Sequence, residues 1–84
     1  MKQFVFTKHS RESMRKRGVS EDEVRIAISK APWQPSKWGR FECTLEFEYN
    51  KEWNKKFYRT KQVVPVFMEE ETRIVIITVY AFYF

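Results

Sequence analysis

The sequence predicts a single α+β domain in which two N-terminal helices pack on an antiparallel sheet of three to four strands. A chain of 84 residues leaves room for one hydrophobic core, and 43% hydrophobic and 18% aromatic residues suffice to fill it. Helical spacing of apolar residues occurs only before Pro32, whereas alternating or continuous apolar runs occupy the chain after residue 40. Helices followed by a run of strands are typical of α+β proteins.

The first helix is predicted between two local signals. Residues 3–6, QFVF, form a short edge strand, and the hydroxyl of Thr7 then caps a helix over residues 8–17 by accepting a hydrogen bond from a first-turn amide. Gly18 follows the last basic residue, where a left-handed residue usually ends a helix. Met14 is the only convincing core residue of this helix, so hydrophobic packing alone does not explain its composition.

The second helix has stronger signals. Ser20 and Glu23 form a capping box, and Val19 and Val24 are spaced as a hydrophobic staple. Acidic residues fill the first turn, which matches the helix dipole. The apolar stripe at helical spacing consists of Val24, Ala27, Ile28 and Ala31. Pro32 ends the helix.

Residues 32–40 are predicted to form a loop, and three strands joined by turns follow. The first strand has polar residues on one face, and its apolar face consists of Phe41, Cys43, Leu45, Phe47 and Tyr49. After a turn over residues 50–55, residues 56–68 form the second strand, in which Pro65 indicates a bulge or an edge position. Residues 73–83 are apolar on both faces, so this strand is predicted to be central or covered on both sides.

The charge and the cysteine content limit the partners and the cofactors. Sixteen Lys and Arg against eleven Asp and Glu give a net charge of +5, which favours an acidic partner such as RNA or an acidic protein. Many small soluble proteins are equally basic, so charge alone does not decide. One Cys and one His cannot form a structural zinc site, and we expect no metal and no cofactor. Cys43 is predicted to be inert core.

No membrane partner is expected. The longest apolar run, from Ile74 to Phe84, is shorter than the roughly 20 residues that span a bilayer. Met1 leads directly into a strand-like segment without a charged and apolar leader. We therefore expect a soluble cytoplasmic protein.

His9 is the main candidate for catalysis. It lies in the first turn of the helix over residues 8–17, where free amides and the positive end of the helix dipole disfavour an imidazolium and attract anions. The positive charges of Lys8, Lys16 and Arg17 further disfavour protonation of the His9 imidazole. A neutral imidazole in this setting could act as a general base and then as a general acid. The alternative is a surface histidine without a role.

The strands offer companions for this histidine. Arg59 and Lys61 are two residues apart, so we expect them on one face of their strand. One face of the last strand is predicted to carry Ile74, Ile76, Thr78, Tyr80 and Phe82. The basic pair, His9 and the hydroxyls of Thr78 and Tyr80 could then surround one phosphate. Alternatively, the basic pair is a solvated strand face, and Tyr80 belongs to the core with its hydroxyl at the rim.

Two segments resemble a known family. The stretch FTKHSRESMRKRGVSEDEV, residues 6–24, and the sequence TVY, residues 78–80, resemble a family of small uncharacterised domains, the domain of unknown function 4258. Its members begin with a strand and the sequence TKHA, followed by an arginine-rich helix that ends in RG. A hydrophobic residue and the sequence SEEEV come next, and the last strand ends in a TVY-like sequence. The match covers both ends of the chain, whereas residues 32–62 are not diagnostic. The family is similar to RelE-like and colicin-like nucleases, which implies a RelE-like or barnase-like arrangement of two helices on a sheet.

The resemblance implies a metal-independent endoribonuclease or a component of a toxin–antitoxin module, with RNA as substrate and a cognate antitoxin protein as partner. In this chemistry the ribose 2′-hydroxyl attacks the adjacent phosphate, and the protein supplies a base, an acid and positive charge. By position, His9 matches the family histidine, Arg17 matches the arginine before the glycine, and Thr78 and Tyr80 match the terminal signature. We expect His9, Tyr80 and Thr78 to be the catalytic residues. The residues expected to bind phosphate are Arg17, Lys16, Arg59, Lys61 and Lys8.

One position departs from the family pattern. Ser13 stands four residues after His9, where the family usually has an arginine, so Lys16 or Arg11 would have to compensate, or the activity is reduced. The departure fits the alternative of a non-catalytic RNA-binding or protein-interaction module. In a third interpretation, an edge strand or the final strand pairs with an antitoxin or with a second copy in a homodimer.

The predicted loops and turns also carry Trp33, Trp38 and Trp53, which either stack on unpaired bases or anchor those segments on the core.

Overall fold

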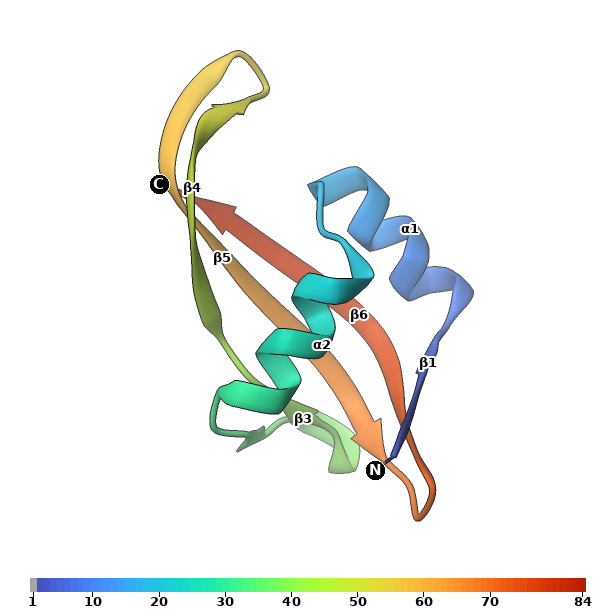
Figure 1. Cartoon of the computed structure of the whole chain (residues 1–84). Coiled ribbons are helices and arrows are strands. Elements are labelled where there is room, and N and C mark those ends of the chain that lie inside the picture. Colours follow the sequence, from blue (N-terminus) through green and yellow to red (C-terminus); the bar gives the residue numbers. More distant parts are fainter. Residues whose placement is uncertain (1) are drawn as a thin grey trace.

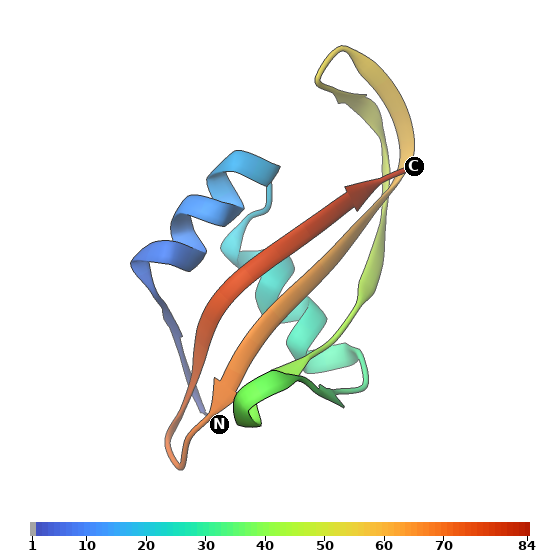
Figure 2. The same ribbon diagram turned by 180° about the vertical axis from the view of Figure 1, so that it is seen from behind.

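The computed structural model describes residues 2–84 and has two layers (Figure 1). Helices α1 (Lys8–Arg17) and α2 (Glu21–Lys30) lie against one face of a six-stranded sheet. Figure 2 shows the opposite face of the sheet, with both helices behind it. The α+β class and the two N-terminal helices agree with the sequence prediction.

The sheet is larger than predicted, and it is mixed. Its strands are β1 (Gln3–Phe6), β2 (Gln34–Pro35), β3 (Phe41–Glu42), β4 (Leu45–Trp53), β5 (Lys56–Glu69) and β6 (Arg73–Tyr83). The order is β1-β6-β5-β3-β2, and β4 also pairs with β5. β1 is parallel to β6, whereas the other neighbours are antiparallel. The prediction of an antiparallel sheet of three to four strands is therefore wrong.

Long-range pairing explains the additional strands. Residues 34–35, inside the predicted loop, pair with β3, and the short 3₁₀ helix η1 (Lys37–Gly39) connects the two strands. β1 is an edge strand, as predicted, and β6 is interior between β1 and β5. The turn between β4 and β5 is shorter than predicted because only Asn54 and Lys55, both at positive φ, form it.

Pro65 explains why the predicted strand over residues 41–49 is divided into β3 and β4. The carbonyl of Pro65 accepts a hydrogen bond from the amide of Cys43 at 3.4 Å. Proline has no amide to donate in return, so the ladder is interrupted where Cys43 and Thr44 pass it. Pro65 is not at an edge of the sheet, because β5 has β6 on one side and β3 and β4 on the other.

A β-bulge in β6 changes which residues share a face. Val66 pairs with Thr78 and Phe67 pairs with Ile76, so Ile77 is an extra residue. An extra residue exchanges the two faces of everything beyond it. The prediction that Ile74, Ile76, Thr78, Tyr80 and Phe82 share one face is therefore wrong: Ile74 and Ile76 are buried under the helices, as is Val79, whereas Tyr80 and Phe82 are exposed.

The helix boundaries follow the predicted caps. The Thr7 hydroxyl accepts from the Ser10 amide at 3.1 Å, and Gly18 ends α1 in the left-handed region at φ 71°. In α2, the Ser20 hydroxyl accepts from the Glu23 amide at 3.1 Å, and the Glu23 carboxylate accepts from the Ser20 amide at 3.0 Å. Local side-chain chemistry thus fixes where both helices begin and end.

The core lies between the helices and the sheet. Its buried apolar residues are Phe6, Met14, Val19, Val24, Ala27, Ile28, Ala31, Cys43, Val63, Phe67, Ile74, Ile76 and Val79. Met14 and the whole predicted stripe of α2 are among them, so the apolar spacing predicted the helix faces correctly. Ser10, Ser13 and Lys61 are the buried polar side chains among residues 2–84.

Candidate functional site

The candidate site lies where α1 replaces β1 as the neighbour of β6. β1 pairs with β6 only as far as Ile76, and beyond that residue α1 runs beside the edge of β6 (Figure 1). The Ser13 hydroxyl donates to the Ser10 carbonyl at 2.9 Å and accepts from the Val79 amide at 3.2 Å. It thereby satisfies a strand-edge amide that would otherwise be buried without a partner. At the other end of α1, the Tyr83 hydroxyl donates to the Arg17 carbonyl.

These bonds give Ser13 a structural role at the position where the resembled family usually has an arginine. Ser13 is 4% exposed, and its hydroxyl is held between α1 and β6 by these two bonds. Of the two residues expected to compensate, Arg11 pairs with Glu21 at 2.6 Å. Lys16 lies on the face of α1 that carries His9 and Ser13.

A hollow of about 250 Å³ opens between this face of α1 and β6. Its lining consists of His9, Glu12, Ser13, Lys16, Arg17, Thr78 and Tyr80. Helical spacing of three, four, seven and eight residues from His9 places the α1 members on one side. The bulge at Ile77 turns Thr78 and Tyr80 away from the core and toward this opening. The structure therefore brings together five of the predicted site residues.

Two cations of the hollow are available to an anionic ligand. Within residues 2–84, neither Lys16 nor Arg17 forms an ion pair. The Arg17 guanidinium carbon lies 5.3 Å from the centroid of the Tyr80 ring, and the Tyr80 side chain is exposed. Such a pair positions a cation without neutralising it. Glu12 adds one negative charge to the lining; the sequence prediction does not include it, although its spacing from His9 places it on this face.

Lys61 is outside this hollow, contrary to the predicted grouping. Its ammonium donates to the Glu23 carboxylate at 2.8 Å and to the Gly18 carbonyl, and the residue is 4% exposed. The rings of Tyr49 and Tyr83 lie 5.6 and 5.9 Å from its nitrogen. Lys61 therefore joins the α1–α2 turn to the sheet on the face that the helices cover.

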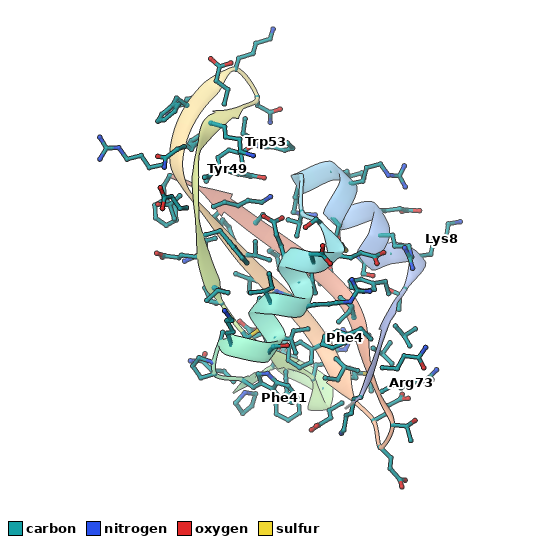
Figure 3. All side chains as sticks on the ribbon, in the orientation of Figure 1. Phe4, Lys8, Phe41, Tyr49, Trp53 and Arg73 are labelled. Carbon is teal, nitrogen blue, oxygen red and sulfur yellow. The ribbon has the colours of Figure 1, made fainter. Side chains whose placement is uncertain are left out.

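Arg59 and Lys8 are also outside the hollow. The amides of Arg59 and Thr60 both donate to the Phe84 carbonyl, at 3.1 and 2.8 Å, an irregularity that interrupts the alternation of β5. Arg59 is exposed and lines a separate depression beside Glu46 and Glu48, so it does not share the environment of Lys61, and the expected basic pair is not formed. Figure 3 shows Lys8 at the N-terminal end of α1, pointing away from the sheet.

The three tryptophans have different environments. Trp33 anchors the loop after α2, because its indole nitrogen donates to the Ile28 carbonyl at 2.8 Å and its ring packs on Phe67. Trp53, labelled in Figure 3, stacks on Tyr83 at 5.0 Å. Trp38 is 81% exposed. Only Trp38 is therefore free to stack on a ligand.

Burial raises the pKa of two weakly acidic groups outside the hollow, Cys43 and Tyr83. Burial, and then the charge of Glu42, raises the pKa of the Cys43 thiol to about 11, so the thiol is protonated at neutral pH. The prediction that Cys43 belongs to the core is confirmed. Burial, followed by Tyr49 and Glu23, raises the pKa of the Tyr83 hydroxyl to about 12. The hydroxyl therefore stays protonated and can donate to α1.

No helix in the described range, residues 2–84, has the length and apolar character needed to cross a membrane. Across the same residues, no three His, Cys, Asp or Glu side chains come together as metal ligands. Comparisons with protein-family models, curated proteins and solved structures find no match. The resemblance to the domain of unknown function 4258 stays a prediction.

Proposed function

We propose that this protein is a small cytoplasmic ribonuclease that works without a metal ion, in keeping with the family that its motifs resemble. The observation that carries the proposal is the placement of His9, Lys16, Arg17 and Tyr80 around one hollow. Cations without ion-pair partners attract phosphate. Imidazole is the side chain whose unperturbed pKa lies nearest neutral pH, so it can both take and return a proton there. A role in a toxin–antitoxin module, with a cognate antitoxin as partner, belongs to the same proposal.

The proposed reaction is transfer of the phosphate to the ribose 2′-oxygen. His9 takes the 2′-hydroxyl proton as the bond between the 2′-oxygen and phosphorus forms. The bond from phosphorus to the 5′-oxygen breaks, and Tyr80 gives its proton to that leaving oxygen. The products are a 2′,3′-cyclic phosphate and a 5′-hydroxyl, and the proton on His9 returns to Tyr80 through solvent. Thr78 lines the same hollow and is assigned as a further hydroxyl donor, and Lys16 stabilises the charge of the phosphorane.

The length of α1 favours a polymeric substrate. His9 and Arg17 are eight residues apart, which is about 12 Å along the helix axis. Side chains of a helix lean toward its N-terminus, so we assign Lys16 to the reacting phosphate and Arg17 to a neighbouring phosphate of the same strand. An RNA strand offers phosphates at both places, whereas a mononucleotide offers one.

A non-catalytic RNA-binding module is the second candidate. The structural role of Ser13, at the position of the usual family arginine, favours it, because that side chain is committed to α1 and β6. Both candidates predict RNA binding at the hollow. They differ in turnover, which only the ribonuclease shows.

Salt-dependent binding tests the assignment of RNA to the hollow. The double variant Lys16→Ala/Arg17→Ala is compared with Arg11→Ala, which removes an arginine of the same helix that pairs with Glu21 outside the hollow. Loss of two phosphate contacts should lower the slope of log Kd against log salt by about 1.4 for a single strand. Arg11→Ala should leave the slope unchanged. Equal effects in both variants, or no RNA binding by the natural protein, would contradict the assignment.

A further inference from the structure

A second groove lies on the face of the sheet that the helices leave open. It is lined by Pro35, Ser36, Lys37, Trp38, Arg40, Glu42, Val66, Thr78 and Tyr80. Figure 2 shows η1, in green, beside the end of β5. Thr78 and Tyr80 belong to both linings, so the groove adjoins the hollow that contains His9 at these two residues.

Trp38 is presented at the tip of a tight loop. The Ser36 amide donates to the Arg40 carbonyl at 2.7 Å, and the Arg40 amide donates to the Lys37 carbonyl at 3.2 Å. These bonds hold Trp38 at φ 58° and ψ 42°, a left-handed conformation that bulky residues rarely adopt. The ring does not fold back on the core: it is 81% exposed, with the Arg40 guanidinium 5.5 Å from its centroid.

Two arginine–aromatic pairs adjoin the groove. Arg40 lies over Trp38 within its lining, and Arg17, which lines the neighbouring hollow, lies over Tyr80, which belongs to both linings. An exposed aromatic ring offers a face to a nucleobase, and the adjacent guanidinium offers donors to the phosphate of the same nucleotide. Lys37 adds a further positive charge, against one carboxylate from Glu42. This charge balance favours a polyanion.

We propose that this groove binds an unpaired nucleotide of single-stranded RNA, with its base stacked on Trp38 and the strand continuing past Tyr80 to the hollow of His9. The inference rests on the proposed function and adds the class of substrate. Bases within a duplex are already stacked on each other and cannot present a face to Trp38, so single-stranded RNA is preferred. The groove therefore acts as a positioning site for the nucleotide beside the cleaved one.

Binding of labelled RNA to Trp38→Ala tests the inference. The matched control is Phe57→Ala, which removes another aromatic ring, 57% exposed, near the tip of the β4–β5 hairpin at the far end of the sheet (Figure 1). Both rings lie in solvent, so both variants should fold. Trp38→Ala should weaken binding of a mixed-sequence single strand roughly tenfold to a hundredfold, and Phe57→Ala should not change it. Affinity for a duplex of the same length should be the same in all three proteins.

The outcomes separate the two proposals. If the natural protein binds the single strand and Trp38→Ala binds it equally well, the groove is not a base-stacking site, although the proposed function stands. An equal loss for single strand and duplex would also overturn base stacking. If the natural protein binds neither RNA, both proposals fail. A poly-glutamate peptide that binds as tightly as the single strand and depends on Trp38 would instead identify an acidic protein as the occupant and overturn the inference.

Discussion

The buried ion pair of Lys61 gives the sharpest stability prediction. Lys61→Met keeps the apolar stem of the side chain. It removes the ammonium, which donates hydrogen bonds to the Glu23 carboxylate at 2.8 Å and to the Gly18 carbonyl. The side chain of Lys61 is 5% exposed and that of Glu23 is 24% exposed. Loss of one partner of a fully buried pair costs about 3–5 kcal/mol. Because Glu23 can partly rehydrate, we expect a loss of about 2–4 kcal/mol in the free energy of unfolding.

Lys2→Met is the matched control for this prediction. Lys2 also donates to a carboxylate, that of Glu69 at 2.8 Å, and to a backbone carbonyl, that of Glu70 at 2.8 Å, but its side chain is 34% exposed. The same substitution there should cost less than about 1 kcal/mol. Urea denaturation followed by circular dichroism measures the free energy of unfolding of both variants. We expect the dependence of this free energy on urea concentration to have a similar slope in both.

The same variant tests whether Lys61 contacts RNA. Because Lys61 is buried away from the hollow, Lys61→Met should retain the RNA affinity of the natural protein under conditions where both are folded. Equal stabilities of Lys61→Met and Lys2→Met would refute the structural role. Full stability combined with lost RNA affinity would show that Lys61 binds phosphate, as the sequence suggested.

Three further predictions concern the contacts of α1. Ser13→Ala leaves the Val79 amide without its partner, and urea denaturation should show a loss of about 1–3 kcal/mol, whereas no loss would contradict that bond. Gly18→Ala places a Cβ 2.6 Å from the Trp53 ring at φ 71°, so we expect a loss of about 2–4 kcal/mol, and an unchanged midpoint would refute the close approach. The pKa of Tyr83 is about 12 in the folded protein, against 10 for an ordinary tyrosine. The protonated hydroxyl therefore contributes its full stabilisation below pH 10, and this stabilisation is lost as the pH rises toward 12. Absorbance titration should show a late-titrating phenol that Tyr83→Phe removes, and an unchanged titration in that variant would contradict the burial of Tyr83.

The sequence was sufficient for features that depend on neighbours along the chain. The caps of both helices and the apolar stripe of α2 depend on residues within one or two turns, and the structure has them where the sequence predicts. Part of the α1 side of the hollow was also accessible, because helical spacing places Lys16 on the face of His9 and Ser13.

Features that depend on partners far along the chain were not accessible. The parallel pairing of β1 joins Gln3 to Arg73, and no local pattern specifies that partner. Ile77 is an apolar residue in an apolar run, so nothing in the alternation marks it as the bulge that turns Tyr80 outward. Likewise, the charge of Lys61 does not tell whether it meets solvent or Glu23.

A cleavage assay with His9→Ala tests the central claim most directly. The natural protein and the variant are incubated with a single-stranded RNA in a metal chelator, beside a DNA strand of the same sequence as control, and the product ends are analysed. The account predicts RNA products with 2′,3′-cyclic phosphate ends, no DNA cleavage because the 2′-hydroxyl is missing, and loss of activity in His9→Ala. RNA that is bound but never cut would favour the non-catalytic module. Cleavage that persists in His9→Ala would contradict the role of this histidine.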